Sequence, residues 1–360
     1  MMESTQPIDR RSVAAATIVP APAEGLASQH SDVGHGVMRA IVQDAYGARE
    51  VFRLAAVDLP EIAADEVLVQ VSAAGMDRGT WHCMTGTPYL MRIMGFGFRR
   101  PRNRVPGLDV AGTVVAVGSA VTRFQPGNEV FGISRGSFAE YAAAREDKLA
   151  HKPATLTFEQ AAVVPISGGT ALQGLRDSGR VKAGDKVLVI GASGGVGTYA
   201  VQLAKALGAQ VTGVCSTSKV DLVRSIGADH VIDYTRDDYT DGVKRYDLIV
   251  DIGGNSRLSR LRRALTPTGT LVIVGGEEGG NLVGGFDRQL RALAMSPFVR
   301  QRLTMLASKE RYVDLETLSP LIESGQITPI VDKTYPLADV PAAMAHLEAG
   351  HARGKIAITI

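Results

Sequence analysis

The feature that most constrains the fold is a glycine-dense turn that joins a short apolar strand to a helix. We predict a buried strand at Val187–Ile190, a helix at Thr198–Leu207 and a second strand at Gln210–Val214. A strand, a helix and a strand in this order place the two strands parallel in one sheet. The alternation continues through "HVIDY", "YDLIVDIGG", "RLSRLRRAL" and "GTLVIVGG". The second half of the chain therefore predicts an α/β fold in which helices cover both faces of a doubly wound parallel sheet.

The first half of the chain has a different pattern. Its Val-rich runs are short and are separated by Gly, Pro, Asp and Asn, as in "EVLVQVSAAGMD" and "VAGTVVAVGSAVTRFQPGNEVFG", which is typical of a small antiparallel β-domain. The chain closes on another alternating apolar run, "GKIAITI", and we expect this strand to return to the first domain. We therefore assign residues 37–158 and 312–360 to the β-domain, and residues 159–311 to a parallel-sheet domain inserted in it.

Residues 1–36 are rich in Ala, Pro, Ser and Gly and have no sustained apolar period, so we predict a disordered tail. The alternative is an export signal beginning at Arg10 and Arg11, but Pro20 and Pro22 interrupt its apolar stretch.

Composition limits the partners. The formal charge of only +2 gives no broad basic field for nucleic acid or an anionic membrane, and no apolar run is long enough for a membrane span. Cys83 and Cys215 form no C-x-x-C pair, so we expect neither a disulfide framework nor a structural zinc site, and we expect a reducing, cytoplasmic location. A small, roughly neutral partner is the expectation that fits best.

The glycine turn predicts a dinucleotide site, because Gly191, Gly194 and Gly197 lie between a predicted strand and a predicted helix. Glycines let the backbone approach a pyrophosphate closely, and the amides at the helix start face its negative charge. No G-K-[ST] follows, which disfavours an ATP-type phosphate loop, and the remaining alternative is a tight turn without a ligand. We assign to the cofactor Gly191, Ser193, Gly194, Gly195, Val196 and Gly197.

The second strand ends without the acid that normally binds the ribose hydroxyls of NAD. The segment reads "VCSTSK" there, and Ser216, Thr217 and Lys219 offer hydroxyl donors and a cation. This set favours the 2′-phosphate of NADP. The alternative is that these are ordinary turn residues and that Lys219 faces water.

Together these motifs resemble the medium-chain dehydrogenase/reductase superfamily, in its zinc-independent quinone oxidoreductase branch. The resemblance covers residues 37–360 and is carried by "VPGLDVAGTVVAVGSAVTRFQPGNEVFG", "GSFAEYAA", "AAVVPISGGTAL", "VLVIGASGGVG", "GADHVIDY" and "ARGKIAITI". It implies a GroES-like β-domain with an inserted Rossmann domain, a cleft between the two, NADPH as cofactor, and commonly a homodimer formed by extending the Rossmann sheets edge to edge.

The places that hold zinc ligands in the family's alcohol dehydrogenases carry other residues here: Gly75 and Met76, then "GLD" at 107–109, and "AAVV" at 161–164. Asp109 alone cannot replace three ligands, and adjacent His82 and Cys83 are a poor arrangement for one ion. We therefore expect no metal, and the reduction of an acceptor that is already activated. The expected reaction is hydride transfer from NADPH to a quinone or an α,β-unsaturated carbonyl.

The resemblance also implies individual roles. Ser167 and Thr170 in "PISGGTAL" lie near the nicotinamide, as does "VGG" with Val274 and Gly275, and Lys355 reaches the cofactor cleft. We add Tyr234 in "HVIDY" and Gly253 in "YDLIVDIGG" to the cofactor residues. The family's "N-P-x-D" loop is altered, because Asp77 replaces its Asn and Thr80 its Asp, which leaves that loop's role open.

Tyr89 is our candidate for polarising the acceptor oxygen, with Thr170 as the second catalytic candidate; the alternative for Tyr89 is packing against the lid. The surrounding insert "MTGTPYLMRIMGFGFRRPRNRVPG" predicts an apolar lid made of Leu90, Met91, Ile93, Met94, Phe96 and Phe98. Arg99, Arg100, Arg102 and Arg104 follow, either as contacts for phosphates or an acidic substrate, or as a solvated basic rim.

Two rival functions remain open at this stage. One is a non-catalytic module that binds NADPH as a structural or sensing ligand. The other is an alcohol or aldehyde oxidoreductase, which would use a metal to form the alkoxide.

Overall fold

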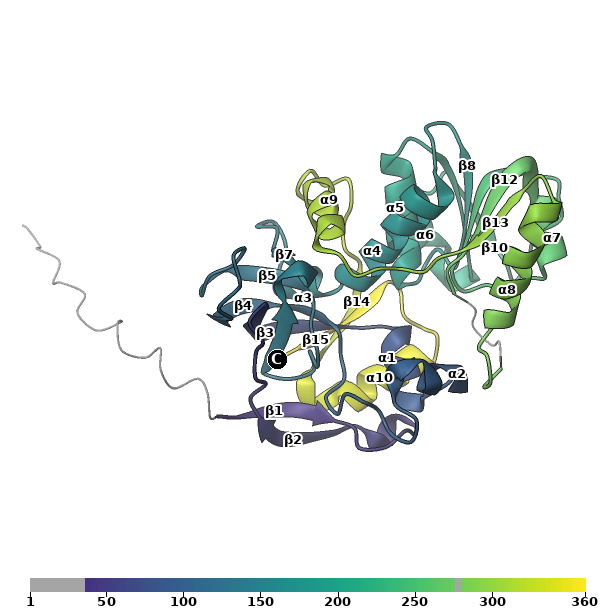
Figure 1. Ribbon diagram of the computed structural model, residues 1–360. Coiled ribbons are helices and arrows are strands. Elements are labelled where there is room, and N and C mark those ends of the chain that lie inside the picture. The colour runs from purple at the N-terminus through teal and green to yellow at the C-terminus, as the bar shows by residue number, and fades with distance from the viewer. Residues whose placement is uncertain (1–35, 276–279) are drawn as a thin grey trace, which may run out of the picture. The chain divides into compact units, whose positions relative to one another are not determined.

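The computed structural model describes residues 36–275 and 280–360, so the predicted tail lies outside the described residues apart from Gly36. Two sheets organise the described chain (Figure 1). The second half forms a six-stranded sheet in the order β10-β9-β8-β11-β12-β13. All its strand pairs are parallel. The strands are β8 Lys186–Ile190, β9 Gln210–Cys215, β10 His230–Asp233, β11 Tyr246–Asp251, β12 Leu265–Ile273 and β13 Arg302–Met305.

Helices cover both faces of this sheet, as a doubly wound fold requires. Along β8, Val187 and Val189 belong to the same core cluster as α5, whereas Leu188 and Ile190 belong to the cluster that contains α7 and α8. The helices are α5 Gly195–Ala206, α6 Val220–Ser225, α7 Leu258–Ala264 and α8 Phe286–Met295. The predicted Rossmann domain is confirmed.

The predicted start of α5 at Thr198 is wrong, because the helix begins at Gly195. Gly194 is its N-cap, with extended backbone at φ −85° and ψ 179°. Glycine has a low helix propensity, which is why the sequence predicts that Gly195 and Gly197 belong to the loop before the helix. In the structure both residues lie in the first turn of α5.

The other sheet belongs to the first half of the chain and its C-terminal return. Its order is β14-β15-β3-β4-β5-β7, and β6 pairs with β3. The last strand pairs antiparallel with β3, with Ile356 opposite Met76. The strands are β3 Glu66–Met76, β4 Asp109–Val117, β5 Glu129–Ile133, β6 Tyr141–Arg145, β7 Leu149–His151, β14 Val331–Pro336 and β15 Lys355–Thr359. A separate hairpin joins β1 Val37–Val42 to β2 Arg53–Asp58. This sheet is the expected GroES-like domain.

Further helices connect and cover these sheets. They are α1 Arg78–Thr85, α2 Tyr89–Met91 with the π-helical turn η2 Arg92–Phe96, α3 Phe158–Ala162, α4 Pro165–Gln173 with η4 Gly174–Gly179, α9 Tyr312–Glu323 and α10 Val340–Glu348. No helix in residues 36–275 or 280–360 is long and apolar enough to cross a membrane.

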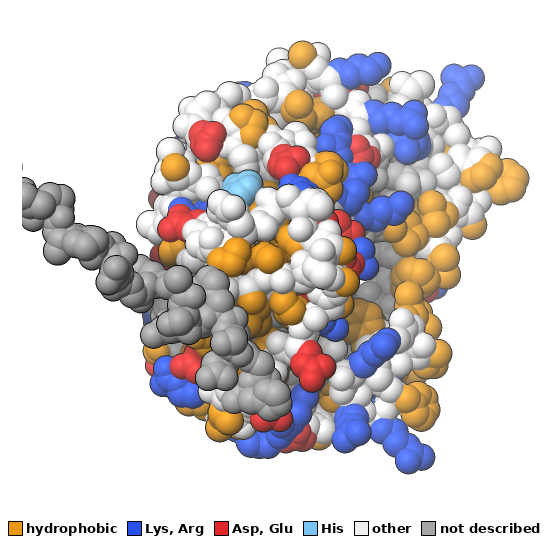
Figure 2. All heavy atoms as spheres, turned by 60° about the vertical axis from the view of Figure 1, so that its left-hand side comes forward, with side chains coloured by type: hydrophobic (Ala, Val, Ile, Leu, Met, Phe, Trp, Pro, Cys, Tyr) orange, Lys and Arg blue, Asp and Glu red, His pale blue; other side chains and the backbone are white. Residues whose placement is uncertain are grey.

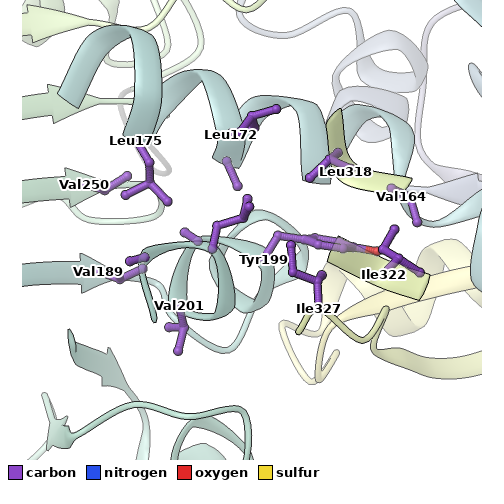
Figure 3. Close-up of a cluster of buried hydrophobic side chains, with 14 of the residues drawn as sticks. Val164, Leu172, Leu175, Val189, Tyr199, Val201, Val250, Leu318, Ile322 and Ile327 are labelled. Carbon is purple, nitrogen blue, oxygen red and sulfur yellow. The ribbon is translucent and has the colours of Figure 1, made fainter. Parts of the chain in front are cut away.

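Tyr199 of α5 fixes the position of α4, which carries Ser167 and Thr170. Its ring lies among Val164, Leu318 and Ile322 (Figure 3), and its hydroxyl donates to the carbonyl oxygen of Val163 at 3.1 Å. Gly168 allows α9 to approach closely, because a Cβ there would lie 3.0 Å from Leu318 Cδ1.

Candidate active site

The glycine turn after β8 leaves an open cradle of backbone. Gly191 has a φ of +84°, a value that favours glycine, and a Cβ on Gly197 would lie 2.0 Å from the Gly191 carbonyl oxygen. No side chain caps the first turn of α5. Its amides and the helix dipole therefore face outward, where they suit the pyrophosphate of a dinucleotide.

The structure brings several predicted cofactor residues together at this turn. The Gly354 amide donates to the Ser193 carbonyl at 2.9 Å, and Gly194 and Gly354 form a parallel bridge. A Cβ on Gly195 would lie 2.8 Å from Lys355 Cδ and 3.1 Å from Ser167 Oγ. The final strand of the GroES-like sheet thus lies directly against the glycine turn of the Rossmann domain.

The neighbouring strand ends also converge here. A Cβ on Gly191 would lie 3.2 Å from the Gly253 amide nitrogen. The Val274 amide donates to the Asp251 carbonyl at 2.8 Å, and a Cβ on Gly275 would lie 2.6 Å from the Ile252 carbonyl oxygen. Gly276, the last residue of the predicted "VGG" contact, lies outside the described residues.

Lys355 lies between two carboxylates. Its ammonium donates to Asp109 Oδ2 at 2.8 Å and to Asp77 Oδ2 at 3.2 Å. Asp109 comes from β4 and also accepts the Ile166 amide at 2.9 Å, whereas Asp77 caps α1 by accepting the Thr80 amide. The side chains of Lys355 and Asp109 are almost completely buried. We call Asp77, Asp109 and Lys355 the buried triad.

Burial and charge shift the pKa values of the triad in different directions. Burial raises the pKa of Asp109 to about 6, although Lys355 opposes the shift. Burial would also raise the pKa of Asp77, but Lys355 and the backbone amides of α1 outweigh it and hold that pKa below its usual value. Burial would lower the pKa of Lys355, but the two carboxylates raise it. Lys355 therefore stays charged at neutral pH.

The site expected for the 2′-phosphate differs from the prediction in one respect. Thr217 Oγ1 donates to Asp233 Oδ2 at 2.5 Å, so a carboxylate lies beside the hydroxyls that we assigned to the phosphate. Lys219 Nζ donates to the carbonyls of Gly350 and Ala352 at 2.8 and 2.9 Å. Ser216 caps the short helix η5 at Thr217–Lys219, and Tyr234 is exposed on the adjacent strand end.

The set at residues 216–219 itself contains no carboxylate, but Asp233 lies beside it. Asp233 was missed because it is remote in sequence and comes close only through the pairing of β10 with β9. A second missed residue, Arg353, donates to the Ser218 carbonyl at 2.7 Å and adds a cation to the same region.

Thr170 and Tyr89 occupy different surroundings. Thr170 is buried on α4 and lines a pocket of about 150 Å³ with Ile166, Gly169 and Ser308. Tyr89 does not line this pocket and is 44% exposed on α2, where the Arg92 guanidinium lies 4.7 Å from its ring centre. Leu90 and Met91 are half-buried, whereas Ile93, Met94, Phe96 and Phe98 are exposed.

Sequence reasoning also misses Asp77 and Asp109, the two partners of Lys355, as site residues. It considers Asp109 only as a zinc ligand, although a carboxylate in the apolar run "GLDVAGTVV" needs a buried partner. Asp77 precedes α1 in a typical N-cap position. Within residues 36–275 and 280–360, no group of three or more His, Cys, Asp or Glu side chains is arranged to hold a metal ion.

Comparison with known proteins agrees with this architecture. Residues 63–154 match the alcohol dehydrogenase GroES-like domain, and residues 226–358 match a family described as zinc-binding dehydrogenase. The chain is 32% identical to the mitochondrial NAD(P)H oxidoreductase RTN4IP1 of Mus musculus, covering 98% of each. It is 35% identical to the chloroplastic NADPH-dependent alkenal/one oxidoreductase of Arabidopsis thaliana, over 89% of this chain and 79% of that protein.

A solved structure agrees with these sequence matches. The quinone oxidoreductase of Coxiella burnetii superposes with a TM-score of 0.77 at 27% identity, covering 90% of this chain and all of that one. The chain belongs to the medium-chain dehydrogenase/reductase superfamily, in its zinc-independent, quinone oxidoreductase-like branch.

Proposed function

We propose that this protein is an oxidoreductase that transfers a hydride from NADPH to a quinone or to the β-carbon of an α,β-unsaturated carbonyl. The observation that carries the proposal is the glycine cradle of α5, closed on one side by Lys355 and Ser167. The names of the Arabidopsis and Coxiella relatives, an NADPH-dependent alkenal/one oxidoreductase and a quinone oxidoreductase, support the same reaction class.

In this proposal the backbone of the turn holds the pyrophosphate, through Gly191, Ser193, Gly194, Gly195, Val196 and Gly197. Ser216, Thr217, Lys219 and Tyr234 hold the 2′-phosphate, with Arg353 as an additional cation, since its guanidinium already reaches Ser218. Asp233 accepts hydrogen bonds on both carboxylate oxygens, from Thr217 and from Thr235, and these bonds partly offset its charge. The Thr217 hydroxyl has a single proton and would have to turn from Asp233 to donate to the phosphate.

The nicotinamide half is assigned to Ser167, Thr170, Gly253, Val274 and Gly275. NADPH supplies the hydride, and the chain supplies position and electrostatics. Lys355 is a buried cation that lies against the turn, and Asp77 and Asp109 hold it in one place. Because the two carboxylates also offset its charge, we assign Lys355 a positioning role between the final strand and the glycine turn.

The acceptor would lie between α4 and the inner part of the lid. Leu90 and Met91 offer half-buried apolar surface, and Tyr89 offers a hydroxyl that makes no hydrogen bond with any described residue. We assign Tyr89 as the donor to the acceptor oxygen. A well-placed donor of this kind contributes about 3 kcal/mol to the transition state.

Steady-state kinetics with NADPH and NADH, each paired with 1,4-naphthoquinone and with 2-hexenal, test this function. We expect turnover with NADPH and a smaller kcat/KM with NADH. Tyr89→Phe should lower kcat about tenfold to a hundredfold with little change in the KM for NADPH. Tight NADPH binding without oxidation by either acceptor would instead identify a binding module.

We also infer a homodimer and a cytoplasmic location. The dimer is supported by β13, which lies at the edge of the six-stranded sheet with one side unpaired within that sheet. The location is supported by the two cysteines, Cys83 and Cys215, which form no disulfide. The Mus musculus and Arabidopsis relatives are named as mitochondrial and chloroplastic proteins, so fractionation of the producing cells is the decisive test.

A further inference from the structure

Four large apolar side chains at the outer end of the lid face solvent. Ile93 is 73% exposed, Met94 65%, Phe96 43% and Phe98 71%. We call these four residues the lid tip. Soluble monomeric proteins rarely gather so many exposed large apolar groups within six residues unless the patch binds something.

The lid tip is exposed although its base is firmly held. Arg92 Nε donates to the Gly86 carbonyl at 2.8 Å, and the Tyr46 hydroxyl donates to the Gly97 carbonyl at 2.6 Å. The Leu90 amide donates to the carbonyl oxygen of Leu282 at 3.2 Å, and the Arg102 amide donates to the carbonyl oxygen of Phe96 at 2.8 Å. These bonds fix the backbone at both ends of the turn, so the apolar side chains extend outward from an ordered base.

Three arginines follow the lid tip directly and have no carboxylate partner among residues 36–275 and 280–360. Arg99, Arg100 and Arg102 are exposed, and none of their side chains makes a hydrogen bond or ion pair with a described residue. Arg104 differs from them, because it is paired with Asp44 at 2.6 Å. We call Arg99, Arg100 and Arg102 the free arginines. On the face drawn in Figure 2, basic and acidic side chains both occur. Residues 99–104 instead hold four arginines and no acid.

The apolar lid tip and the free arginines together limit the kinds of partner that could bind this patch. A second copy of this chain meeting the same patch across a two-fold axis would bring the free arginines of both copies together. A stable protein partner would need about 800 Å² on each side, which the lid tip would have to share with neighbouring surface such as the exposed Leu282. An anionic bilayer suits both the apolar side chains and the arginines. The apolar side chains enter the boundary between headgroups and acyl chains, and the guanidinium groups bind lipid phosphates.

We propose that the lid tip and the free arginines form a docking site for the surface of an anionic lipid bilayer. The docking is interfacial and goes beyond the proposed hydride transfer. It uses a local basic cluster, not the broad basic field that the formal charge of +2 excludes. It would bring the mouth of the lid to the place where apolar quinones and long-chain enones partition.

Flotation of the full-length protein with lipid vesicles tests the proposal without using catalysis. Vesicles of phosphatidylcholine containing phosphatidylglycerol should carry the protein, vesicles of phosphatidylcholine alone should carry at least tenfold less, and added salt should release it. Each arginine near an anionic surface contributes about fivefold in binding, so Arg99→Gln/Arg100→Gln/Arg102→Gln should weaken binding more than tenfold.

Ile93→Ser/Phe98→Ser should weaken vesicle binding by at least tenfold as well. The controls remove equal charge at three exposed arginines that are ion-paired, Arg224, Arg236 and Arg291, and an exposed apolar group at Val243, which is 84% exposed. These controls should bind vesicles as the unmodified protein does. All these positions are exposed, so circular dichroism should show a folded protein in each case.

Equal binding to neutral and anionic vesicles, no binding to either, or unchanged binding of the lid variants would overturn the proposal. So would sedimentation velocity showing that Ile93→Ser/Phe98→Ser turns a dimer into a monomer, because the patch would then be covered by a second copy. Failure of these tests leaves NADPH oxidation unaffected, so the docking site and the proposed enzyme activity are tested separately.

Discussion

Lys355 links the two halves of the candidate site at the scale of single residues. It lies in the last strand, holds carboxylates from β3–α1 and β4, and contacts the glycine turn of the Rossmann domain. The two buried carboxylates share Lys355 as their cation, so removing the lysine leaves both of them as uncompensated buried charges.

We therefore predict that Lys355→Met lowers the free energy of unfolding by about 3 kcal/mol or more, since Asp77 and Asp109 lose their common partner. Lys355→Met combined with Asp109→Asn should recover part of this loss, because one of the two carboxylates is then neutral. Thermal and urea unfolding of the three proteins measure the effect. A Lys355→Met protein as stable as the unmodified one would show that the triad contributes nothing.

The pKa of Asp109, raised to about 6 by burial, predicts a pH dependence of stability. Its folded pKa lies above the unfolded value near 3.8, so the folded state binds the proton more tightly between these two values. The contribution of Asp109 to stability is therefore greatest below pH 4 and is lost as the pH rises to about 6. It amounts to about 3 kcal/mol at most.

The contribution of Asp77 to stability depends on pH in the opposite direction. Because its pKa is lowered in the folded state, it stabilises the protein at higher pH, and this stabilisation is lost on acidification. The difference between the unmodified protein and Asp109→Asn isolates the Asp109 contribution. Thermal midpoints measured from pH 4 to pH 7 should fall with rising pH relative to the variant. Parallel curves would mean that Asp109 has an ordinary pKa.

Among the secondary-structure elements, the turn between β8 and α5 has no room for a side chain at Gly197 but has room for a methyl group at Gly194. A Cβ on Gly197 would lie 2.0 Å from the Gly191 carbonyl oxygen, whereas the nearest atom to a Cβ on Gly194 would be 3.6 Å away. Gly197→Ala should therefore destabilise the protein by about 1–3 kcal/mol.

Gly194→Ala is the matched control, and it should leave the thermal midpoint nearly unchanged. Both variants should bind NADPH at least tenfold more weakly, Gly197→Ala through a displaced turn and Gly194→Ala through a methyl group in the cradle. Differential scanning fluorimetry and fluorescence titration separate the two effects. Equal thermal midpoints for the two variants would contradict the packing described for the turn.

The elements of the Rossmann domain were predictable because their evidence is local. Strands of four to nine residues and amphipathic helices leave characteristic apolar patterns in the sequence, and glycines mark the turns between them. The first turn of α5 was misplaced because the requirement for close backbone approach outweighed the low helix propensity of Gly195 and Gly197.

The candidate site was only partly predictable, because its contacts are not local. Lys355 lies 278 residues from Asp77 and 246 from Asp109, and no spacing rule joins them. Asp233 reaches Thr217 only because β10 pairs with β9, although the parallel strand order could have indicated that their ends meet. Roles for Tyr89 and Thr170 remain predictions, since these residues occupy different surroundings.

At the scale of the whole molecule, the unpaired edge at β13 predicts self-association. Light scattering coupled to size exclusion should give twice the mass of one chain, because two such edges can extend the six-stranded sheet across a two-fold axis. A monomeric mass at all accessible concentrations would contradict this arrangement.

In the proposed reaction, the Rossmann and GroES-like domains hold NADPH and the acceptor together so that a hydride passes from one to the other. This transfer is tested with NADPH that carries deuterium at C4 of the nicotinamide, in each of its two stereochemical forms, and with 2-hexenal as acceptor. We predict that mass spectrometry finds deuterium at the β-carbon of the reduced product from one form and not from the other. Reduced product without deuterium from either form, or no reduced product at all, would contradict hydride transfer at this site.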